Sequence, residues 1–230
     1  MSDVIAASQK TAKFVKIPHG DARNAVKLLG RYGRIIGMTK GQFSLIDLIS
    51  ALLEKIGPSH CVVSTWTTGI RDQESADWLL RTGRILSLKF LTDYSFPSRQ
   101  PKYAESMVER FGSDTIWCTR THAKFALLSN DDGWRVVIRS SMNLNRNPRF
   151  EQFDIDDDAE IFAFFEAQVD DICKPERSGV AWSIPKIKRE FTRLMKDERD
   201  DNDIEFGDSD DTDLVALMER DIEAVGRYFE

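Results

Sequence analysis

The sequence predicts a three-layer α/β/α domain, in which helices cover both faces of a mixed sheet. Between residues 59 and 119, short apolar segments alternate with amphipathic ones, which is the pattern of strands separated by helices. Two further apolar segments joined by a turn follow, so antiparallel strands are expected beside the parallel ones. The 230 residues are enough for one such domain with appendages at both ends.

The elements follow from periodicity and from helix-ending residues. We expect residues 1–20 to be an irregular arm and residues 21–34 to be a short basic helix. Apolar residues recur at helical spacing in 43–57, and Gly57-Pro58 ends that helix. Strands are expected at 60–68, 84–94 and 115–119, the helices between them at 72–83 and 101–112, and a last helix at 157–173.

A hairpin lies between the third of these strands and the last helix. Segments 122–128 and 134–141 are mostly apolar, and residues 130–133 (NDDG) between them are a turn signal. Side chains alternate along a strand, so His122 and Lys124 point to the same face.

The hairpin also returns the chain to its starting point. Ser141 and Asn143, just past the second segment, therefore come back beside His122 and Lys124 at one end of the sheet. An imidazole, an ammonium, a hydroxyl and an amide converge there, which predicts a phosphate site with a candidate nucleophile. A lone H-x-K is weak evidence, but strand, turn, strand and S-x-N in this order are much more specific.

This arrangement resembles the phospholipase D superfamily, whose signature contains H-x-K and S-x-N followed by an acidic residue. Glu151 stands where that acidic residue is expected. Two positions depart from the signature, because Ser129 replaces its Asp and Ser140 replaces its Gly. The resemblance covers about residues 40–175 and implies the same three-layer fold.

The residue chemistry and the resemblance imply one mechanism. His122 attacks phosphorus and gives a phosphohistidine, while Lys124 and Asn143 hold the non-bridging oxygens. Ser141 donates a further hydrogen bond or fixes the loop. Glu151 orients His122 through its other ring nitrogen. The catalytic residues are thus expected to be these five.

The reaction also needs a second acid–base group to protonate the leaving oxygen. His19 and His60 belong to no second H-x-K, so one chain lacks a complete site. Like single-motif nucleases of the superfamily, the protein is expected to form a homodimer in which each subunit contributes His122. The chemistry requires no metal and no cofactor, and the sequence has no metal-ligand cluster.

Charge divides the chain. Net charge is −6, but residues 196–230 contain 14 acidic and 4 basic residues, and the first 40 residues hold eight Lys or Arg. The expected organisation is a basic arm with a short helix (1–40), the catalytic domain (41–175), a helical extension (176–196), and an acidic linker with an amphipathic helix (197–230). The apolar stripe of that last helix should dock on a protein partner, the sister subunit or its own body; the alternative is a solubilising tail.

Side chains near the motifs allow two readings. Arginines 120, 139, 146 and 149 are candidates for contacts with a nucleic-acid backbone or with the acidic segment 154–160. Trp117 and Trp134 are candidates for stacking on bases, but as lone aromatics in strands they fit the core better. Thr65, Thr67 and Asp93 lie at strand ends, where they fit capping roles better than chemistry.

Substrate and location follow from what the chain lacks. No apolar run approaches 18 residues, and the N-terminus has no secretory segment, so we expect a cytoplasmic protein that does not act at a membrane. The basic arm favours nucleic acid, with DNA ahead of RNA or another phosphodiester. The expected function is a metal-independent phosphodiesterase, a nuclease acting on DNA. The alternative is a catalytically silenced domain that binds DNA or a protein.

Overall fold

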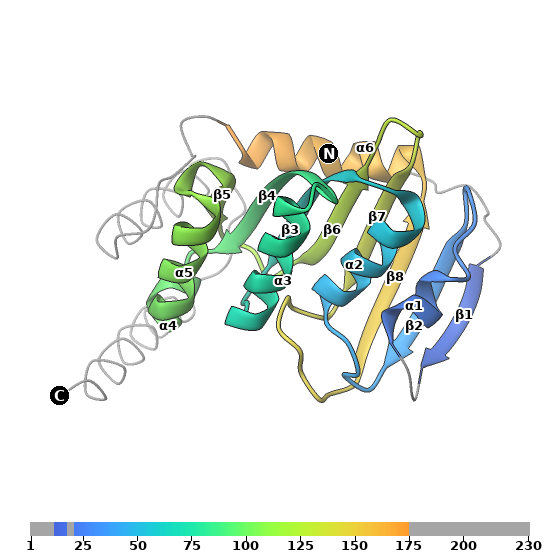
Figure 1. Ribbon diagram of the computed structural model, residues 1–230, viewed down its shortest axis with the longest axis horizontal. Helices are drawn as coiled ribbons and strands as arrows, with labels where there is room; N and C mark the ends of the chain where they lie inside the picture. The colour runs from blue at the N-terminus through green and yellow to red at the C-terminus, as the bar shows by residue number, and fades with distance from the viewer. Residues whose placement is uncertain (1–11, 18–20, 175–230) are drawn as a thin grey trace, which may run out of the picture. The chain divides into compact units, whose positions relative to one another are not determined.

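The computed structural model describes residues 12–17 and 21–174, which form one mixed sheet with helices around it (Figure 1). The strands are β1 (Ala12–Ile17), β2 (Arg34–Thr39), β3 (Ser59–Thr65), β4 (Ile85–Asp93), β5 (Ile116–Thr119), β6 (Lys124–Ser129), β7 (Arg135–Ser140) and β8 (Glu151–Asp157). The helices are α1 (Ala22–Val26), α2 (Leu45–Ile56), α3 (Ile70–Arg81), α4 (Phe96–Arg99), α5 (Pro101–Phe111) and α6 (Ala159–Ile172), with a 3₁₀ turn at Ser113–Thr115.

The strand order is β1-β2-β8-β7-β6-β3-β4-β5. Pairing is parallel within β3-β4-β5 and between β1 and β2, and antiparallel elsewhere. The carboxyl ends of β2, β3, β4, β5 and β7 therefore share one edge with the amino ends of β6 and β8. We call this the lower edge, after its place in Figure 1, and define it by Thr39, Thr65, Asp93, Lys124 and Glu151. The opposite, upper edge carries the ends of the same strands at Ser59, Ile85, Ser129, Arg135 and Asp157.

Helices cover both faces, as the sequence predicts. The larger core joins one face of the sheet to α1, α2, α3 and α5, and a smaller core joins the other face to α6 through Phe162 and Val169. The predicted α/β class with a mixed sheet is confirmed.

Helix α2 illustrates how the sequence fixes an element. Ser44 begins it with a capping box, in which the Ser44 backbone N–H donates to Asp47 Oδ2 at 2.8 Å. Eight of its twelve residues are buried, because apolar side chains recur on one face. Gly57 ends it with φ +89°, a conformation that favours glycine.

Three strands were missed in the sequence reading. The arm predicted to be irregular contains β1, and the helix predicted at 21–34 stops at Val26 and gives way to β2. Strand β2 contains Gly37, which weakens the strand signal; a Cβ there would lie 2.1 Å from the Phe153 ring, so the packing demands glycine.

Strand β8 was missed for an electrostatic reason. Its acidic residues are more typical of a loop than of a strand. In the structure, however, Asp154 and Asp156 form ion pairs with arginines on the neighbouring strands, Arg34 and Arg139. Neutralised in this way, acidic residues are tolerated in a central strand. The last helix consequently begins at 159 rather than 157.

The helical extension predicted at 176–196 and the acidic linker and helix predicted at 197–230 lie outside the described residues. The described residues belong to one compact unit, Met1–Phe191. Among them, no helix combines the length and apolarity that crossing a bilayer requires.

Candidate functional site

The lower edge brings the two halves of the motif together. Residues 122–124 lead into β6, and residues 141–143 follow β7 directly. Because β6 and β7 pair antiparallel, Lys124 lies opposite Ser140. Strand β8 then pairs with β7, which places Glu151 at the same edge.

His122 and Lys124 are in direct contact. Lys124 Nζ lies 3.2 Å from His122 Nδ1 and donates to the His122 carbonyl at 3.1 Å. An ammonium only donates, so Nδ1 is the acceptor in this contact and Nε2 points away from Lys124's hydrogen bond. The imidazole itself is exposed, so an incoming phosphate can reach it.

Trp66, just after β3, connects His122 to Asn143. Its ring packs against the His122 ring with centroids 5.4 Å apart, and its backbone N–H donates to Asn143 Oδ1 at 3.3 Å. The Asn143 carbonyl in turn accepts from the N–H of Leu45, the first residue of α2. Histidine and asparagine of the motif thus lie on either side of one residue.

Ser141 and Glu151 form a second pair at this edge. The Ser141 hydroxyl donates to the Glu151 carboxylate and accepts from the Gln152 N–H at 3.0 Å. Burial lowers the pKa of Lys124, and the nearby Glu151 carboxylate opposes that effect. The expected hydrogen bond from His122 to Glu151 is replaced here by the contact of the ring with Lys124.

Side chains at the ends of two other strands, β3 and β4, hold the backbone of the segments that carry His122 and Asn143. Asp93, at the end of β4, accepts from the Thr121 N–H at 3.1 Å and from the Ser95 N–H at 2.9 Å. Ser64 in β3 donates to the Ala123 carbonyl at 2.8 Å. Thr65 accepts from the Leu144 N–H at 3.2 Å, which ties the loop after β7 to the same place.

The two departures from the signature fall at different ends of the strands. Ser129 is the last residue of β6, paired with His60 at the upper edge, about 17 Å along the strand from Lys124. Ser140 is at the lower edge, where its hydroxyl donates to the Gln152 carbonyl at 2.8 Å and accepts from the Met142 N–H at 2.9 Å.

The flanking arginines divide into two groups. Arg139 is ion-paired with Asp154 and Asp156, in agreement with one of the two readings. Arg120 and Arg149 are exposed, and Arg146 donates to the Gly41 carbonyl at 3.1 Å.

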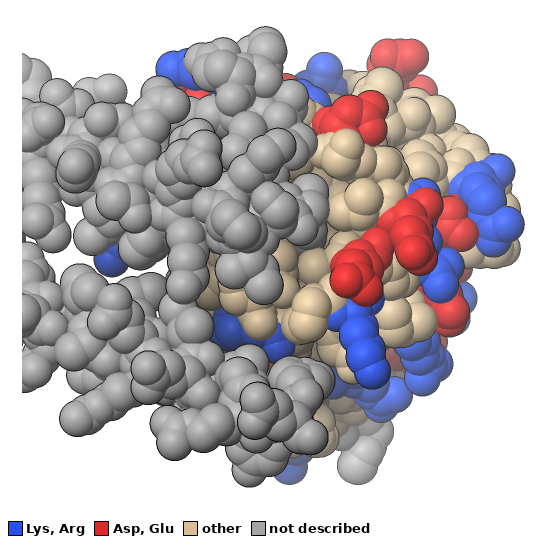
Figure 2. Space-filling model, turned by 90° about the vertical axis from the view of Figure 1, so that its left-hand side faces the viewer, with Lys and Arg blue, Asp and Glu red and all other residues tan. Residues whose placement is uncertain are grey.

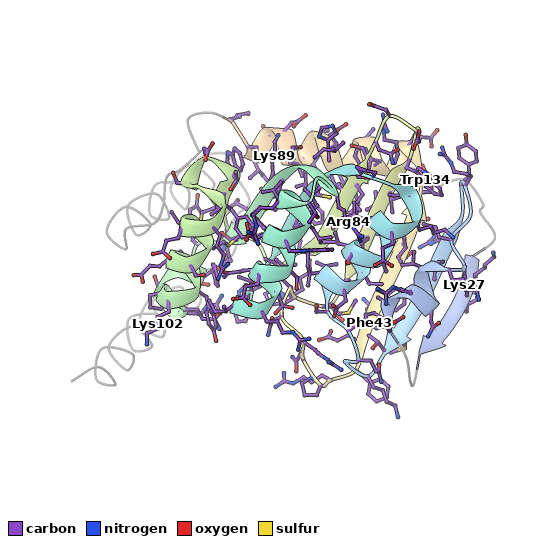
Figure 3. The ribbon with its side chains drawn as sticks, in the orientation of Figure 1. Lys27, Phe43, Arg84, Lys89, Lys102 and Trp134 are labelled. Carbon is purple, nitrogen blue, oxygen red and sulfur yellow. The ribbon has the colours of Figure 1, made fainter. Side chains whose placement is uncertain are left out.

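On the face drawn in Figure 2, basic and acidic side chains are interspersed over the described surface, and several of the basic ones lie in its lower half. Figure 3 places Lys102, near the start of α5, at the lower edge as well. The two strand tryptophans of the motif region pack against the cores, Trp117 on the α6 side and Trp134 on the other.

Two residues at this edge were missed in the sequence reading, Trp66 and Arg99. The Arg99 guanidinium lies 3.5 Å from the centroid of the Trp66 ring, and its Nη2 donates to the Trp66 carbonyl at 3.1 Å. A tryptophan directly after a strand whose carboxyl end faces the motif was the available signal for Trp66. Arg99 had no such signal, because its position depends on the turn that α4 makes.

Other nucleophiles are less suited to chemistry. Burial raises the pKa of the Cys61 thiol to about 12 and that of the Cys118 thiol to about 11, so both stay protonated near neutral pH. In the described part of the chain, no group of three or more His, Cys, Asp or Glu residues is arranged as a metal site.

The chain is similar to two solved structures. A polyphosphate kinase from Porphyromonas gingivalis is 12% identical, with a TM-score of 0.49 over 70% of this chain and 30% of that one. A yeast tyrosyl-DNA phosphodiesterase is 12% identical, with a TM-score of 0.34 over 54% of this chain and 46% of that one. This chain therefore spans less than half the length of either. No protein-family model and no curated protein sequence matches it.

Proposed function

We propose that this chain is a phospholipase D-like phosphodiesterase that cleaves nucleic acid, with DNA as its first substrate. One observation carries the proposal: Trp66 contacts both the His122 ring and the Asn143 side chain. Residues 21 positions apart in the sequence, which share no strand, thereby form one cluster with Lys124. That cluster combines a nucleophile with donors for phosphate oxygens.

The proposed reaction uses Nε2 of His122. A new N–P bond forms, the P–O bond to the leaving strand breaks, and water later attacks phosphorus and releases the histidine. Attack by Nε2 requires that nitrogen to be without a proton, so the proton of the neutral ring must then be on Nδ1, the atom that Lys124 contacts. A bound phosphodiester would draw the Lys124 ammonium to its oxygens and free Nδ1 for that proton.

The acid for the leaving oxygen is proposed to come from a second copy of the chain. His60 is the second residue of β3, at the upper edge, where its Nδ1 lies 2.8 Å from Ser87 Oγ, so it is at the opposite edge of the sheet from His122. A two-fold dimer that faces one His122 towards the other would supply both the nucleophile and the acid.

DNA is supported by the charge distribution. Several basic side chains lie in the lower half of the face in Figure 2, among acidic ones, and the exposed Arg149 lies in the loop beside the site. Trp66 also offers an aromatic ring next to His122. Basic and aromatic groups around one exposed edge are typical of surfaces that hold a single nucleic-acid strand.

The test is cleavage of supercoiled plasmid in EDTA. We expect nicking by wild-type protein, loss of nicking in His122→Ala, and full activity in His60→Ala, which removes the histidine at the other edge. Equal activity of the two variants would contradict the assignment of His122.

Mixing experiments test the dimer. Heterodimers of His122→Ala and wild type contain one nucleophile but no complete site, so activity should fall more steeply than the fraction of mutant chain. Activity proportional to the wild-type fraction, together with a monomer in sedimentation, would rule out the shared site.

A silenced domain that binds nucleic acid is the second candidate. The contact of Lys124 with Nδ1 and the pairing of Glu151 with Ser141 favour it, because neither prepares His122 for attack. The Ser129 replacement itself is remote from the site. Retention of DNA without nicking, unchanged by His122→Ala, would support this candidate.

A further inference from the structure

Two arginines stack on tryptophans at opposite edges of β3 and β4, and they differ in one respect. Arg84 lies 5.0 Å from the Trp78 ring and forms an ion pair with Glu54 at 3.7 Å. Arg99 lies 3.5 Å from the Trp66 ring, and no carboxylate among the described residues is within ion-pair distance of it. The first arginine has a carboxylate partner, whereas the second has none among the described residues.

The donors of Arg99 are only partly used. Its Nε donates to Ser95 Oγ at 2.9 Å and its Nη2 to the Trp66 carbonyl at 3.1 Å. Its Nη1 donates to no described residue, so both N–H groups of Nη1 and one of Nη2 remain available. Burial lowers the pKa of Arg99, and the more distant Asp93 carboxylate opposes that effect. A partly desolvated cation whose counter-charge lies beyond ion-pair distance is unfavourable, and an anion bound against it would offset that cost.

The position of Arg99 indicates which anion it would bind. Its guanidinium and the His122 ring contact the same indole, so their separation is limited by the sum of two short distances. The guanidinium does not touch Lys124 or Asn143, which would hold the reacting phosphate. The guanidinium therefore lies near the proposed position of the reacting phosphate without contacting the groups that would hold that phosphate.

We propose that Arg99, held over the Trp66 ring, forms a second phosphate subsite that binds the neighbouring phosphate of a single nucleic-acid strand. This inference rests on the proposed function, and it narrows the substrate to a strand with at least two adjacent phosphates. The planar guanidinium suits two-pronged contact with phosphate oxygens. Serine and the tryptophan carbonyl fix its orientation, so little freedom is lost on binding.

The test compares two substrates in Arg99→Met and Arg84→Met. Bis(p-nitrophenyl) phosphate has one phosphodiester, whereas a single-stranded DNA oligonucleotide has many. We expect Arg99→Met to lower kcat/KM for the oligonucleotide by about tenfold, mainly through KM, and to leave that for the small diester within about twofold. Arg84→Met should change neither. Equal losses on both substrates, or no loss on the oligonucleotide, would overturn the subsite.

Measurements of DNA binding test the phosphate subsite independently of whether the protein cleaves DNA. The dependence of log K on log salt should become shallower by about 0.7 in Arg99→Met for single-stranded DNA, and should be unchanged in Arg84→Met. If wild-type protein cleaves neither substrate, the proposed function fails, and the salt slope alone decides the subsite: a reduced slope supports it and an unchanged slope overturns it. Should Arg99→Met unfold, Arg99→Gln serves for the same measurements, since its amide can still donate to the Trp66 carbonyl.

Discussion

Each edge of the sheet has an arginine stacked on a tryptophan, but among the described residues only the arginine at the upper edge also pairs with a carboxylate. At the upper edge Arg31 lies 4.5 Å from the Trp134 ring, donates to the carbonyls of Asp132 and Gly133, and pairs with Asp157 at 3.2 Å. At the lower edge Arg99 stacks on Trp66 without a carboxylate partner.

The polar groups around these arginines follow the same division. Asp157 also accepts from the backbone N–H groups of Tyr32 and Arg135, at 2.8 and 3.1 Å. At the lower edge the exposed His122 ring packs against Trp66, and its polar contact among the described residues is with the Lys124 ammonium. A satisfied network stabilises the fold, whereas groups left partly satisfied at one edge are available to a ligand.

The largest expected effect is on chemistry at the lower edge. Lys124→Met removes the cation that would hold the phosphate, so kcat should fall by about 10³-fold. The free energy of unfolding should change by less than about 0.5 kcal/mol, because Lys124 forms no ion pair with a described residue. Nicking assays and denaturant titrations of the same preparation measure both. Loss of stability in proportion to activity would mean that the lower edge also holds the fold together.

At the upper edge we expect a substitution to lower stability and to leave kcat unchanged. Asp157→Ala removes a carboxylate that is 3% exposed and leaves Arg31 without its ion pair, so the free energy of unfolding should fall by about 3 kcal/mol. The kcat of the remaining folded protein should be unchanged. Asp131→Ala, an exposed aspartate in the nearby turn, is the matched control and should cost less than about 0.5 kcal/mol. If Asp157→Ala lowered the free energy of unfolding no more than Asp131→Ala does, the upper edge would not be the more important one for stability.

The sequence predicts the lower edge better than it predicts the sheet. His122, Lys124 and Asn143 come together because strand alternation and a hairpin are local rules, and those rules suffice to place them. Strand β8 could not be predicted in the same way, since its aspartates are neutralised by Arg34 and Arg139 from other strands. Arg99 is a further case, because only the tertiary structure brings it to Trp66.

A smaller effect should appear in the pH profile of the lower edge. Burial lowers the pKa of Lys124 and the Glu151 carboxylate opposes this, so Glu151→Gln should lower that pKa further. If protonated Lys124 is required, the alkaline limb of kcat/KM should move to lower pH in the variant. Glu151→Asp keeps the charge and should leave the limb closer to that of wild type. A limb that stays in place, or moves to higher pH, would exclude Lys124 as the group that sets it.

The smallest expected effect concerns Asp72, a carboxylate near the start of α3. Burial raises its pKa to about 6, and the hydroxyl of Ser44 lies 3.2 Å from both Asp72 Oδ1 and Asp47 Oδ2. One hydroxyl proton cannot be donated to two carboxylates at once. A folded pKa above the ordinary value favours the protonated form, so this contribution to stability is complete below about pH 4 and is lost as the pH rises through 6.

Asp72→Asn imitates the protonated form at every pH. Since the carboxylate is only partly buried, we expect the variant to be more stable than wild type by about 1 kcal/mol at pH 8 and nearly equal to it at pH 4.5. Asp47→Asn is the matched control with the opposite sign, because Asp47 accepts from the Ser44 backbone N–H in the capping box and its loss should destabilise α2. Thermal unfolding of the three proteins at both pH values measures the difference. A stabilisation by Asp72→Asn that does not depend on pH would show that packing rather than charge is responsible.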